Sequence, residues 1–290
     1  MRQTTLGKTS EAISAIGFGG MPLSIQGRPP EDQSRRVINA AIDAGMTFID
    51  TADVYCLDDS DIGHNERLIA SVLRERSDRG EVRVATKAGI RRPKGAWTND
   101  GRPKHIREAC EMSLRALETE QIFLYQLHGP DPGVPFEKTI EAFAELQREG
   151  KFRHFGLSNV SVKQLDAASK IINVVSVQNK LNPYFRDALD DGIVYECEQR
   201  GMTFLAYSPM GGGRLAKKLP ESPVLREISR KRGASPHAVT LAWVRSKGTT
   251  VVPIPAARSE EHAVDSARSI GLTLTPEEIA AIDDAEFSRA

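Results

Sequence analysis

The sequence predicts an α/β fold, a parallel eight-stranded (β/α)8 TIM barrel, formed by one domain over residues 1–290. Short apolar or β-branched runs alternate with amphipathic helical runs eight times, with no linker, low-complexity tract or charge block between them. The strand runs are continuously apolar, which is typical of a parallel sheet buried on both faces. Each helical run provides the crossover that two parallel strands require.

The first four units occupy the N-terminal half of the chain. Their strands are expected at 15–20, 47–50, 82–87 and 122–128, and their helices at 31–45, 66–73, 105–117 and 138–150. Pro29 and Pro30 suit the start of the first helix, where a missing N–H loses no helical partner, and Gly45 suits its C-terminal cap. In the third helix Ile106, Cys110 and Leu114 recur at helical spacing, so Cys110 is expected in the core.

The last four units complete the ring. Their strands are expected at 154–159, 174–179, 203–209 and 250–255, and their helices at 162–170, 188–201, 222–232 with 236–247, and 260–267. The residues before Ala15 are expected to form a hairpin that plugs the barrel bottom. The tail 275–287, with Pro276 near its start, is expected to form an extra surface helix after the barrel.

A doubly wound dinucleotide-binding sheet is the competing fold. Residues 211–216 match the pattern G-x-G-x-x-A after a strand. Pro220 and Pro223 interrupt the helix that should follow, so the match is weak and the barrel is favoured.

Composition excludes several classes of protein. Lys and Arg number 39 and so do Asp and Glu, and this balance argues against a nucleic-acid partner. No apolar run approaches the ~18 residues of a membrane span, and the N-terminus lacks the apolar core of a secretory signal. Three cysteines without a CxxC pair and six scattered histidines predict no disulfide framework and no metal site, and a cytoplasmic location is expected.

Polar residues gather at the ends of the expected strands. The C-terminal strand ends of a barrel face its active site, and the residues found there, with Tyr55 just after the second strand, are Asp50, Lys87, His128, Ser158, Asn159, Gln178, Asn179, Tyr207 and Ser208. Taken singly, an Asp after a strand is usually a helix cap, a Lys a solvated end and a His structural. Their occurrence in successive strands favours a catalytic site, although spacing alone does not name the reaction.

The same residues carry a resemblance to a known family. Asp50-Thr51-Ala52-Asp53-Val54-Tyr55, followed by Lys87 and His128, resembles the signature and catalytic tetrad of the aldo-keto reductases. Three further motifs agree with it: Gly156-Leu157-Ser158-Asn159, Ala206-Tyr207-Ser208-Pro209-Met210, and Ile254-Pro255 followed by Arg258. The match extends from residue 17 to residue 266. The family is a (β/α)8 barrel that binds NADP(H) in an extended pose without a Rossmann fold.

The resemblance implies the roles of the tetrad. Tyr55 would protonate the carbonyl oxygen while NADPH delivers a hydride to a small aldehyde or ketone, and the reverse reaction would oxidise an alcohol. Lys87 would lower the pKa of Tyr55, Asp50 would hold Lys87 charged and oriented, and His128 would position the substrate oxygen.

The resemblance also implies the cofactor contacts. Ser158, Asn159 and Gln178 would hold the carboxamide, Tyr207 would stack on the nicotinamide, and the following loop would wrap the pyrophosphate. The full expected set is Ser158, Asn159, Gln178, Tyr207, Ser208, Met210, Gly211, Gly213, Lys218, Ile254, Ala256, Arg258, His262, Asp265 and Ser266. The helix that begins near Ser259 would add partial positive charge for phosphate.

The adenosine end departs from the family pattern. Ala256 replaces a usual Gly, Lys217 another usual Gly, and His262, Asp265 and Ser266 stand where many members have Gln and then Glu-Asn. Arg258 still offers a guanidinium to a 2′-phosphate, so NADP is expected rather than NAD.

Substrate contacts are expected from Met21, Trp97 and His128, which suggest an apolar slot with a polar oxygen site. Trp97 fits a second role equally well, as a cover on the barrel rim. The acidic run 58–61 is expected to be a solvated loop.

Two other functions stay open. One is a sugar dehydrogenase or pyridoxal reductase of the same family, and the other is a cofactor-sensing regulatory subunit of the ion-channel type.

Overall fold

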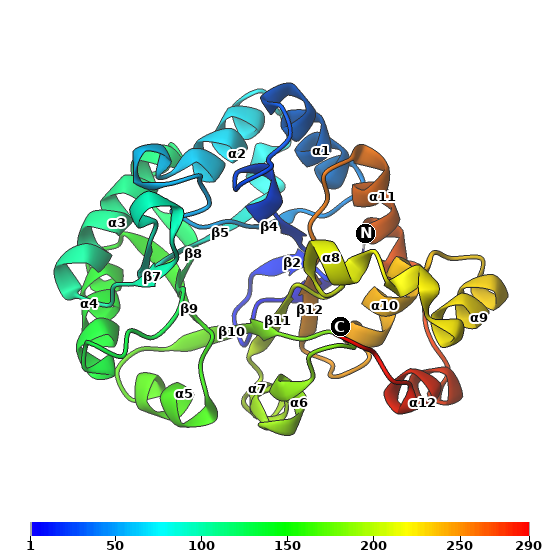
Figure 1. Cartoon of the computed structure of the whole chain (residues 1–290). Helices are drawn as coiled ribbons and strands as arrows, with labels where there is room; N and C mark the ends of the chain where they lie inside the picture. The colour runs from blue at the N-terminus through cyan, green and yellow to red at the C-terminus, as the bar shows by residue number, and fades with distance from the viewer. Residues whose placement is uncertain (1, 290) are drawn as a thin grey trace.

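The computed structural model describes residues 2–289 and shows a ring of parallel strands surrounded by helices (Figure 1). The barrel strands are β3 (Phe18–Gly19), β4 (Phe48–Asp50), β5 (Arg83–Ala88), β8 (Ile122–Leu127), β9 (Phe152–Ser158), β10 (Val174–Lys180), β11 (Thr203–Tyr207) and β12 (Val251–Ile254). They neighbour one another in chain order, and the backbone N–H groups of Gly17 and Gly19 donate to the carbonyls of Pro253 and Pro255 at 2.9 and 2.8 Å. These bonds join the first strand to the last. The barrel is thereby confirmed, and the doubly wound sheet, whose strand order reverses, is excluded.

The helices lie outside the strands. They are α1 (Glu31–Asp43), α2 (His64–Arg74), α3 (Pro103–Ala116), α4 (Phe136–Arg148), α5 (Val162–Ser169), α6 (Asp187–Asp190), α7 (Ile193–Arg200), α8 (Gly212–Ala216), α9 (Pro223–Arg232), α10 (Pro236–Arg245), α11 (Glu260–Arg268) and α12 (Pro276–Asp284). Short 3-10 turns occur at Met21–Leu23, Asp59–Asp61, Arg79–Glu81, Pro93–Gly95, Leu219–Glu221 and Ser269–Gly271. The prediction of one helix over 188–201 is wrong, because Gly192 adopts a left-handed φ of 75° and separates α6 from α7.

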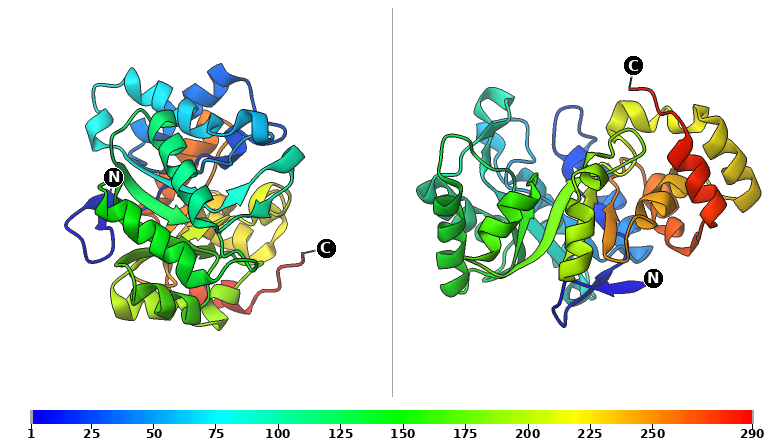
Figure 2. Two further views of the ribbon diagram at one scale, coloured as in Figure 1. Left: turned by 90° about the vertical axis from the view of Figure 1, so that its left-hand side faces the viewer. Right: turned by 90° about the horizontal axis from the view of Figure 1, so that it is seen from below.

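Both predicted additions to the barrel are present. Strands β1 (Gln3–Thr5) and β2 (Ala12–Ser14) pair antiparallel, and the hairpin lies across one end of the barrel (Figure 2). Leu6 and Ile13 of this hairpin are buried against interior residues such as Phe48 and Leu205, so the hairpin closes that end. Helix α12 follows the barrel as expected, with Thr275 as a capping-box residue before Pro276.

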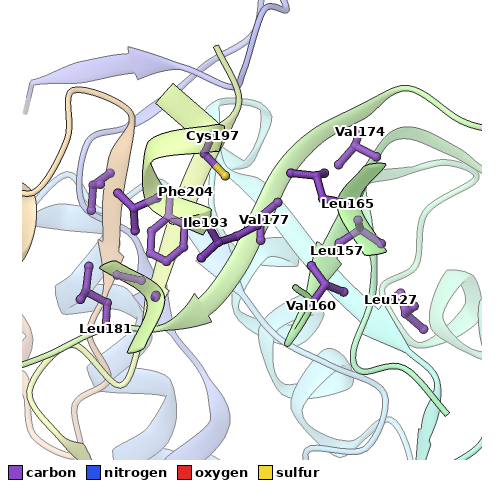
Figure 3. Packing of buried hydrophobic residues seen from close by; sticks show 14 of the residues in the cluster. Leu127, Leu157, Val160, Leu165, Val174, Val177, Leu181, Ile193, Cys197 and Phe204 are labelled. Carbon is purple, nitrogen blue, oxygen red and sulfur yellow. The ribbon is translucent and has the colours of Figure 1, made fainter. Parts of the chain in front are cut away.

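The main core lies between the strands and the surrounding helices. Val177 and Phe204 from the sheet pack against Ile193 and Cys197 from α7, as Figure 3 shows. Cys110 of α3 belongs to the same cluster and is fully buried, which confirms its predicted core position. The helices are thus fixed by apolar burial. The polar residues at the C-terminal ends of the strands lie outside this apolar core, next to the loops that follow the strands.

One loop at that end has structure of its own. Strands β6 (Ile90–Arg91) and β7 (Thr98–Asn99) form a small antiparallel pair after β5. This hairpin carries Arg92 and Trp97 beside the strand ends.

Candidate active site

Neighbouring strands bring the predicted catalytic residues together. Asp50 is the last residue of β4, Lys87 lies in β5, and His128 follows β8, while Tyr55 lies in the loop after β4. The register pairs Asp50 with Ala85, and Lys87 with Gln126 of β8. All four residues of the expected tetrad are buried.

The Lys87 ammonium uses its three N–H bonds within the protein. Lys87 Nζ donates to Asp50 Oδ1 at 2.6 Å, to the carbonyl of Thr51 at 2.8 Å and to the Tyr55 hydroxyl oxygen at 3.0 Å. Because these acceptors come from three directions, the ammonium is held at a fixed point under the Tyr55 ring.

The second oxygen of Asp50 is held by two amides. Gln178 Nε2 and Gln126 Nε2 donate to Asp50 Oδ2 at 2.8 and 3.2 Å. The sequence predicted Gln178 as a cofactor contact, and it missed Gln126. A signal was present, since Gln126 stands two residues before His128 and alternation along a strand places both on the inner side.

Burial and charge act against each other on Lys87 and Tyr55. Burial alone would lower the pKa of Lys87, but the neighbouring Asp50 and Tyr55 outweigh it and raise that pKa, so the ammonium is retained. Burial raises the pKa of Tyr55, although Lys87 acts to lower it. The expected direction of the Lys87 effect is therefore confirmed, but the predicted net lowering of the Tyr55 pKa is wrong, because desolvation of a buried phenolate costs more.

His128 is neutral in this setting. Burial first, and then the Lys87 charge, lower its pKa well below the ordinary value. Its ring lies edge-on to that of Tyr55, with 5.7 Å between the centroids. Its Nδ1 is buried and has no hydrogen-bond partner within residues 2–289.

Two buried carboxyls lie behind the tetrad, and sequence reasoning missed their contribution. Burial, and then the Glu66 charge, raise the pKa of Asp53 well above its usual value, and burial raises the pKa of Glu66. Glu66 Oε1 accepts from the Thr86 hydroxyl at 2.6 Å, while Glu66 Oε2 and Asp53 Oδ1 have no partner among the described residues. Burial thus acts against the charged form of both carboxyls, whereas Asp50 has its charge paired with Lys87.

The predicted substrate residues lie near Tyr55. Met21 packs against the small cluster that contains Val54 and Tyr55. The Trp97 ring is 47 % exposed, and its edge-on contacts place it 6.4 Å from the Tyr55 ring and 6.3 Å from the His128 ring, between centroids. Trp97 thus fits both expected roles, a wall beside the reactive groups and a cover at the rim. The acidic run 58–61 forms a 3-10 turn, in which Asp61 pairs with Arg28.

The predicted nicotinamide contacts meet at the ends of β9, β10 and β11. Asn159 has a left-handed φ of 58°, and its Nδ2 donates to the carbonyl of His128 at 2.9 Å and to Ser158 Oγ at 3.1 Å. Tyr207 donates to Asn159 Oδ1 at 2.8 Å. Ser158 Oγ donates to the carbonyl of Gln178 at 2.9 Å. The structure brings the four residues into one connected group.

The loop after β11 makes a tight backbone turn. Ser208 and Gly211 have φ values of 47° and 89°, and a Cβ at Gly211 would lie 2.8 Å from Leu215 Cβ, so only glycine fits there. Gly213 lies in α8, and a Cβ at this position would meet open space. Met210 packs partly against the core, and Lys218 follows α8 at the start of a 3-10 turn.

The adenosine-end residues differ in their access to solvent. Arg258 and His262 are exposed, and no carboxylate lies within ion-pair distance of the Arg258 guanidinium in the part of the chain described. Asp265 accepts from the Ser235 hydroxyl at 2.6 Å, and Ser266 is buried, so both already pack within the protein. The remaining two, Ile254 and Ala256, lie buried and half-buried beside the first strand.

Residues 2–289 contain no group of three or more His, Cys, Asp or Glu side chains placed to hold a metal ion. Within the same residues, every helix is too short or too polar to cross a bilayer.

Comparisons with known proteins agree with this geometry. An aldo-keto reductase from Strobilurus tenacellus is 32% identical, with 93% of this chain and 88% of that protein aligned. The glycerol dehydrogenase AKR11B4 from Gluconobacter oxydans is 28% identical with a TM-score of 0.84, covering 97% of this chain and 94% of the other. An aldo-keto reductase from Klebsiella pneumoniae, solved in complex with NADPH, is 28% identical with a TM-score of 0.80, covering 98% and 95%.

A family model covers almost the whole chain. The model described as the aldo/keto reductase family matches residues 15–286, a span that includes every residue of the expected tetrad. The chain therefore belongs to the aldo/keto reductase family.

Proposed function

We propose that this protein reduces the carbonyl group of small aldehydes or ketones with NADPH and catalyses the reverse oxidation of the alcohol. The observation that carries the proposal is the hydrogen-bonded chain from Asp50 through Lys87 to the Tyr55 hydroxyl, with neutral His128 beside it. NADPH, when bound, supplies the hydride for the carbonyl carbon.

The residues at the strand ends fit this cofactor. The side-chain nitrogen of Gln178 donates to Asp50 and Gln126, which leaves its carbonyl oxygen to accept from a carboxamide. Arg258 brings an exposed guanidinium without a carboxylate partner in residues 2–289, as a 2′-phosphate requires. The Klebsiella pneumoniae structure in complex with NADPH supports the same assignment.

The chain's own groups would handle the proton. Tyr55, which burial keeps protonated, would donate its hydroxyl proton to the carbonyl oxygen. Lys87 would stabilise the tyrosinate that forms, and Asp50 would fix Lys87 in place. His128 would hold the substrate oxygen with a neutral imidazole N–H, because its lowered pKa prevents it from competing as an acid.

The Gluconobacter oxydans relative favours a second candidate, oxidation of a polyol. The same groups would then run in reverse, with tyrosinate at Tyr55 accepting the alcohol proton.

A substrate screen tests the proposal. Nicotinamide absorbance would be followed with aldehydes, ketones, aldoses and pyridoxal plus NADPH, and with polyols plus NADP+, all after treatment with a strong chelator. We expect steady turnover of at least one small aldehyde with the chelator present. Turnover that needs added metal, or tight NADPH binding with no turnover of any compound, would contradict the proposal. The second outcome would favour a cofactor-sensing subunit.

A further inference from the structure

Arg92 is a fully buried arginine in the loop that carries Trp97. Its Nη2 donates to Gln26 Oε1 at 3.0 Å and to the carbonyl of Leu57 at 3.1 Å. Gln26 Nε2 donates to the same Leu57 carbonyl at 2.8 Å. The guanidinium is therefore anchored by the loops after β3 and β4.

The rest of the Arg92 guanidinium is unpaired. Its Nε and Nη1 are buried and have no hydrogen-bond acceptor within residues 2–289. Unmet N–H groups on a buried charge are costly, and a buried guanidinium normally has an anionic partner.

No acidic side chain of the described residues forms an ion pair with Arg92. Asp61, in the neighbouring loop, pairs with Arg28 and accepts from the Leu57 N–H. Hydrogen bonds from the Ser60 hydroxyl and N–H, and then the Arg92 charge, lower the pKa of Asp58, but the Asp58 carboxylate makes no direct contact with Arg92. The Arg92 guanidinium thus lacks a direct carboxylate partner among residues 2–289.

Trp97 connects this charge with the reactive groups. The Arg92 Cζ lies 3.9 Å from the centroid of the Trp97 ring, and the same ring contacts Tyr55 and His128 edge-on. When a substrate carbonyl lies at Tyr55, only the Trp97 ring therefore separates the far end of that substrate from Arg92. Trp97 is half exposed, and its contact with Arg92 is weaker than a charge-assisted hydrogen bond.

We propose that Arg92 binds the carboxylate of a carbonyl substrate, which would displace the Trp97 ring from the guanidinium. A carboxylate is favoured because its two oxygens can accept from Nε and Nη1, the two donors of Arg92 without an acceptor in residues 2–289, and its negative charge suits a guanidinium without a direct carboxylate partner. The proposal deepens the function above and rests on it. It assigns the substrate class as aldehydes or ketones that carry a carboxylate.

A matched pair of substrates tests the assignment. 4-Carboxybenzaldehyde and methyl 4-formylbenzoate have the same ring and reactive group and differ in charge. We expect kcat/KM of the wild-type protein to favour the acid by about 10-fold or more, the effect of one charge-assisted hydrogen bond. In Arg92→Met this ratio should fall to about 1, through a higher KM for the acid. Arg91→Met is the control, because Arg91 is the exposed neighbour and its loss should keep the wild-type ratio.

Each other outcome overturns the assignment. A wild-type protein that reduces both compounds equally well has no carboxylate site, although the proposed reductase function stands. A protein that reduces neither compound nor any other carbonyl contradicts the reductase function itself. An unchanged ratio in Arg92→Met, with both rates lowered, means that Arg92 only holds the loops. If Arg92→Met does not fold, Arg92→Lys is used in its place. Lysine has a point charge and a different side-chain geometry, so the acid-to-ester ratio of kcat/KM should fall if Arg92 binds the carboxylate. An unchanged ratio in Arg92→Lys would show that Arg92 has only a structural role.

Discussion

The ammonium of Lys87 donates a 3.0 Å hydrogen bond to the hydroxyl oxygen of Tyr55, and yet burial raises the pKa of that hydroxyl. The two effects have separate consequences for catalysis. Burial keeps the phenol protonated before the reaction, so a proton is available. The fixed ammonium stabilises the tyrosinate only once the proton has left, which is when the transition state needs it.

This relationship predicts the effect of Tyr55→Phe. The substitution removes one hydroxyl and little volume, so the fold and NADPH binding should persist, while aldehyde reduction should fall by at least ~100-fold. Initial rates with a neutral aromatic aldehyde and a fluorescence titration with NADPH measure the two properties separately. Tyr195→Phe is the control, because Tyr195 is 62% exposed on α7. Near-normal turnover in Tyr55→Phe would exclude Tyr55 as the proton donor.

The tetrad was predictable because parallel strands place their C-terminal ends at one face of a barrel. Asp50, Lys87 and His128 lie at or next to the C-terminal ends of three successive strands, so strand order alone brings them together. Alternation along the strand also predicts that Gln126 points to the same side as His128, but a single polar residue inside an apolar run belongs to no recognisable motif. Arg92 lies in an irregular loop, where sequence gives no periodicity, and only the fold shows that its guanidinium is buried against Trp97.

The net pKa direction of Tyr55 was not predictable for a different reason. A motif shows that a lysine accompanies the tyrosine, but desolvation depends on how completely the surrounding loops cover the hydroxyl. The break between α6 and α7 likewise depends on one backbone angle at Gly192, which an amphipathic pattern does not reveal.

The lowered pKa of His128 predicts a pH-dependent contribution to stability. Unfolded chains protonate histidine near pH 6.5, whereas folded His128 stays neutral, so the unfolded state binds more protons below that pH. Stability contributed by neutral His128 is therefore present above about pH 6.5 and is lost as the pH falls. Thermal melts should show that the wild-type protein has a higher Tm relative to His128→Gln at pH 8 than at pH 5.5, so the difference in Tm between the two proteins decreases as the pH falls.

A control separates this effect from those of other histidines. Burial also lowers the pKa values of His64, His105 and His154, so the wild-type melt alone is not diagnostic. His262→Gln removes an exposed imidazole from α11 and is measured in parallel as the matched substitution. A His128→Gln difference that does not change with pH would show that His128 titrates normally in the folded protein.

Cys56 lies beside Tyr55 in the chain and is predicted to have no chemical role. Burial raises its pKa to about 12, and its Sγ donates to the carbonyls of Val54 and Asp58 at 3.3 Å each. A protonated, buried thiol is a poor nucleophile. Cys56→Ser keeps a donor at the same place, so kcat/KM should change by no more than a few-fold. Complete loss of turnover with an unchanged Tm would mean that a thiol takes part in the reaction.

Arg258 is predicted to select NADPH over NADH. It follows β12 just before α11, is exposed, and has no carboxylate partner in the described residues, so its charge is not already neutralised. Its backbone carbonyl accepts from Gln33 Nε2 at 2.7 Å, which fixes the start of the side chain. A guanidinium that binds the 2′-phosphate would gain charge-assisted hydrogen bonds. NADH lacks this phosphate and cannot gain them.

Arg258→Ala should therefore weaken NADPH binding by between about 10- and 150-fold, the range expected for hydrogen bonds to a charged group, and leave NADH nearly unchanged. Fluorescence titration of both cofactors into both proteins measures the two affinities directly. Arg268→Ala, at the other end of the same helix, removes the same exposed charge and should change neither affinity by more than a small factor. Added salt should weaken NADPH more than NADH in the wild-type protein and should lose this difference in Arg258→Ala, because screening acts on the phosphate contact. Equal weakening of the two cofactors would show that Arg258 holds the loop at the start of α11 and does not contact the phosphate.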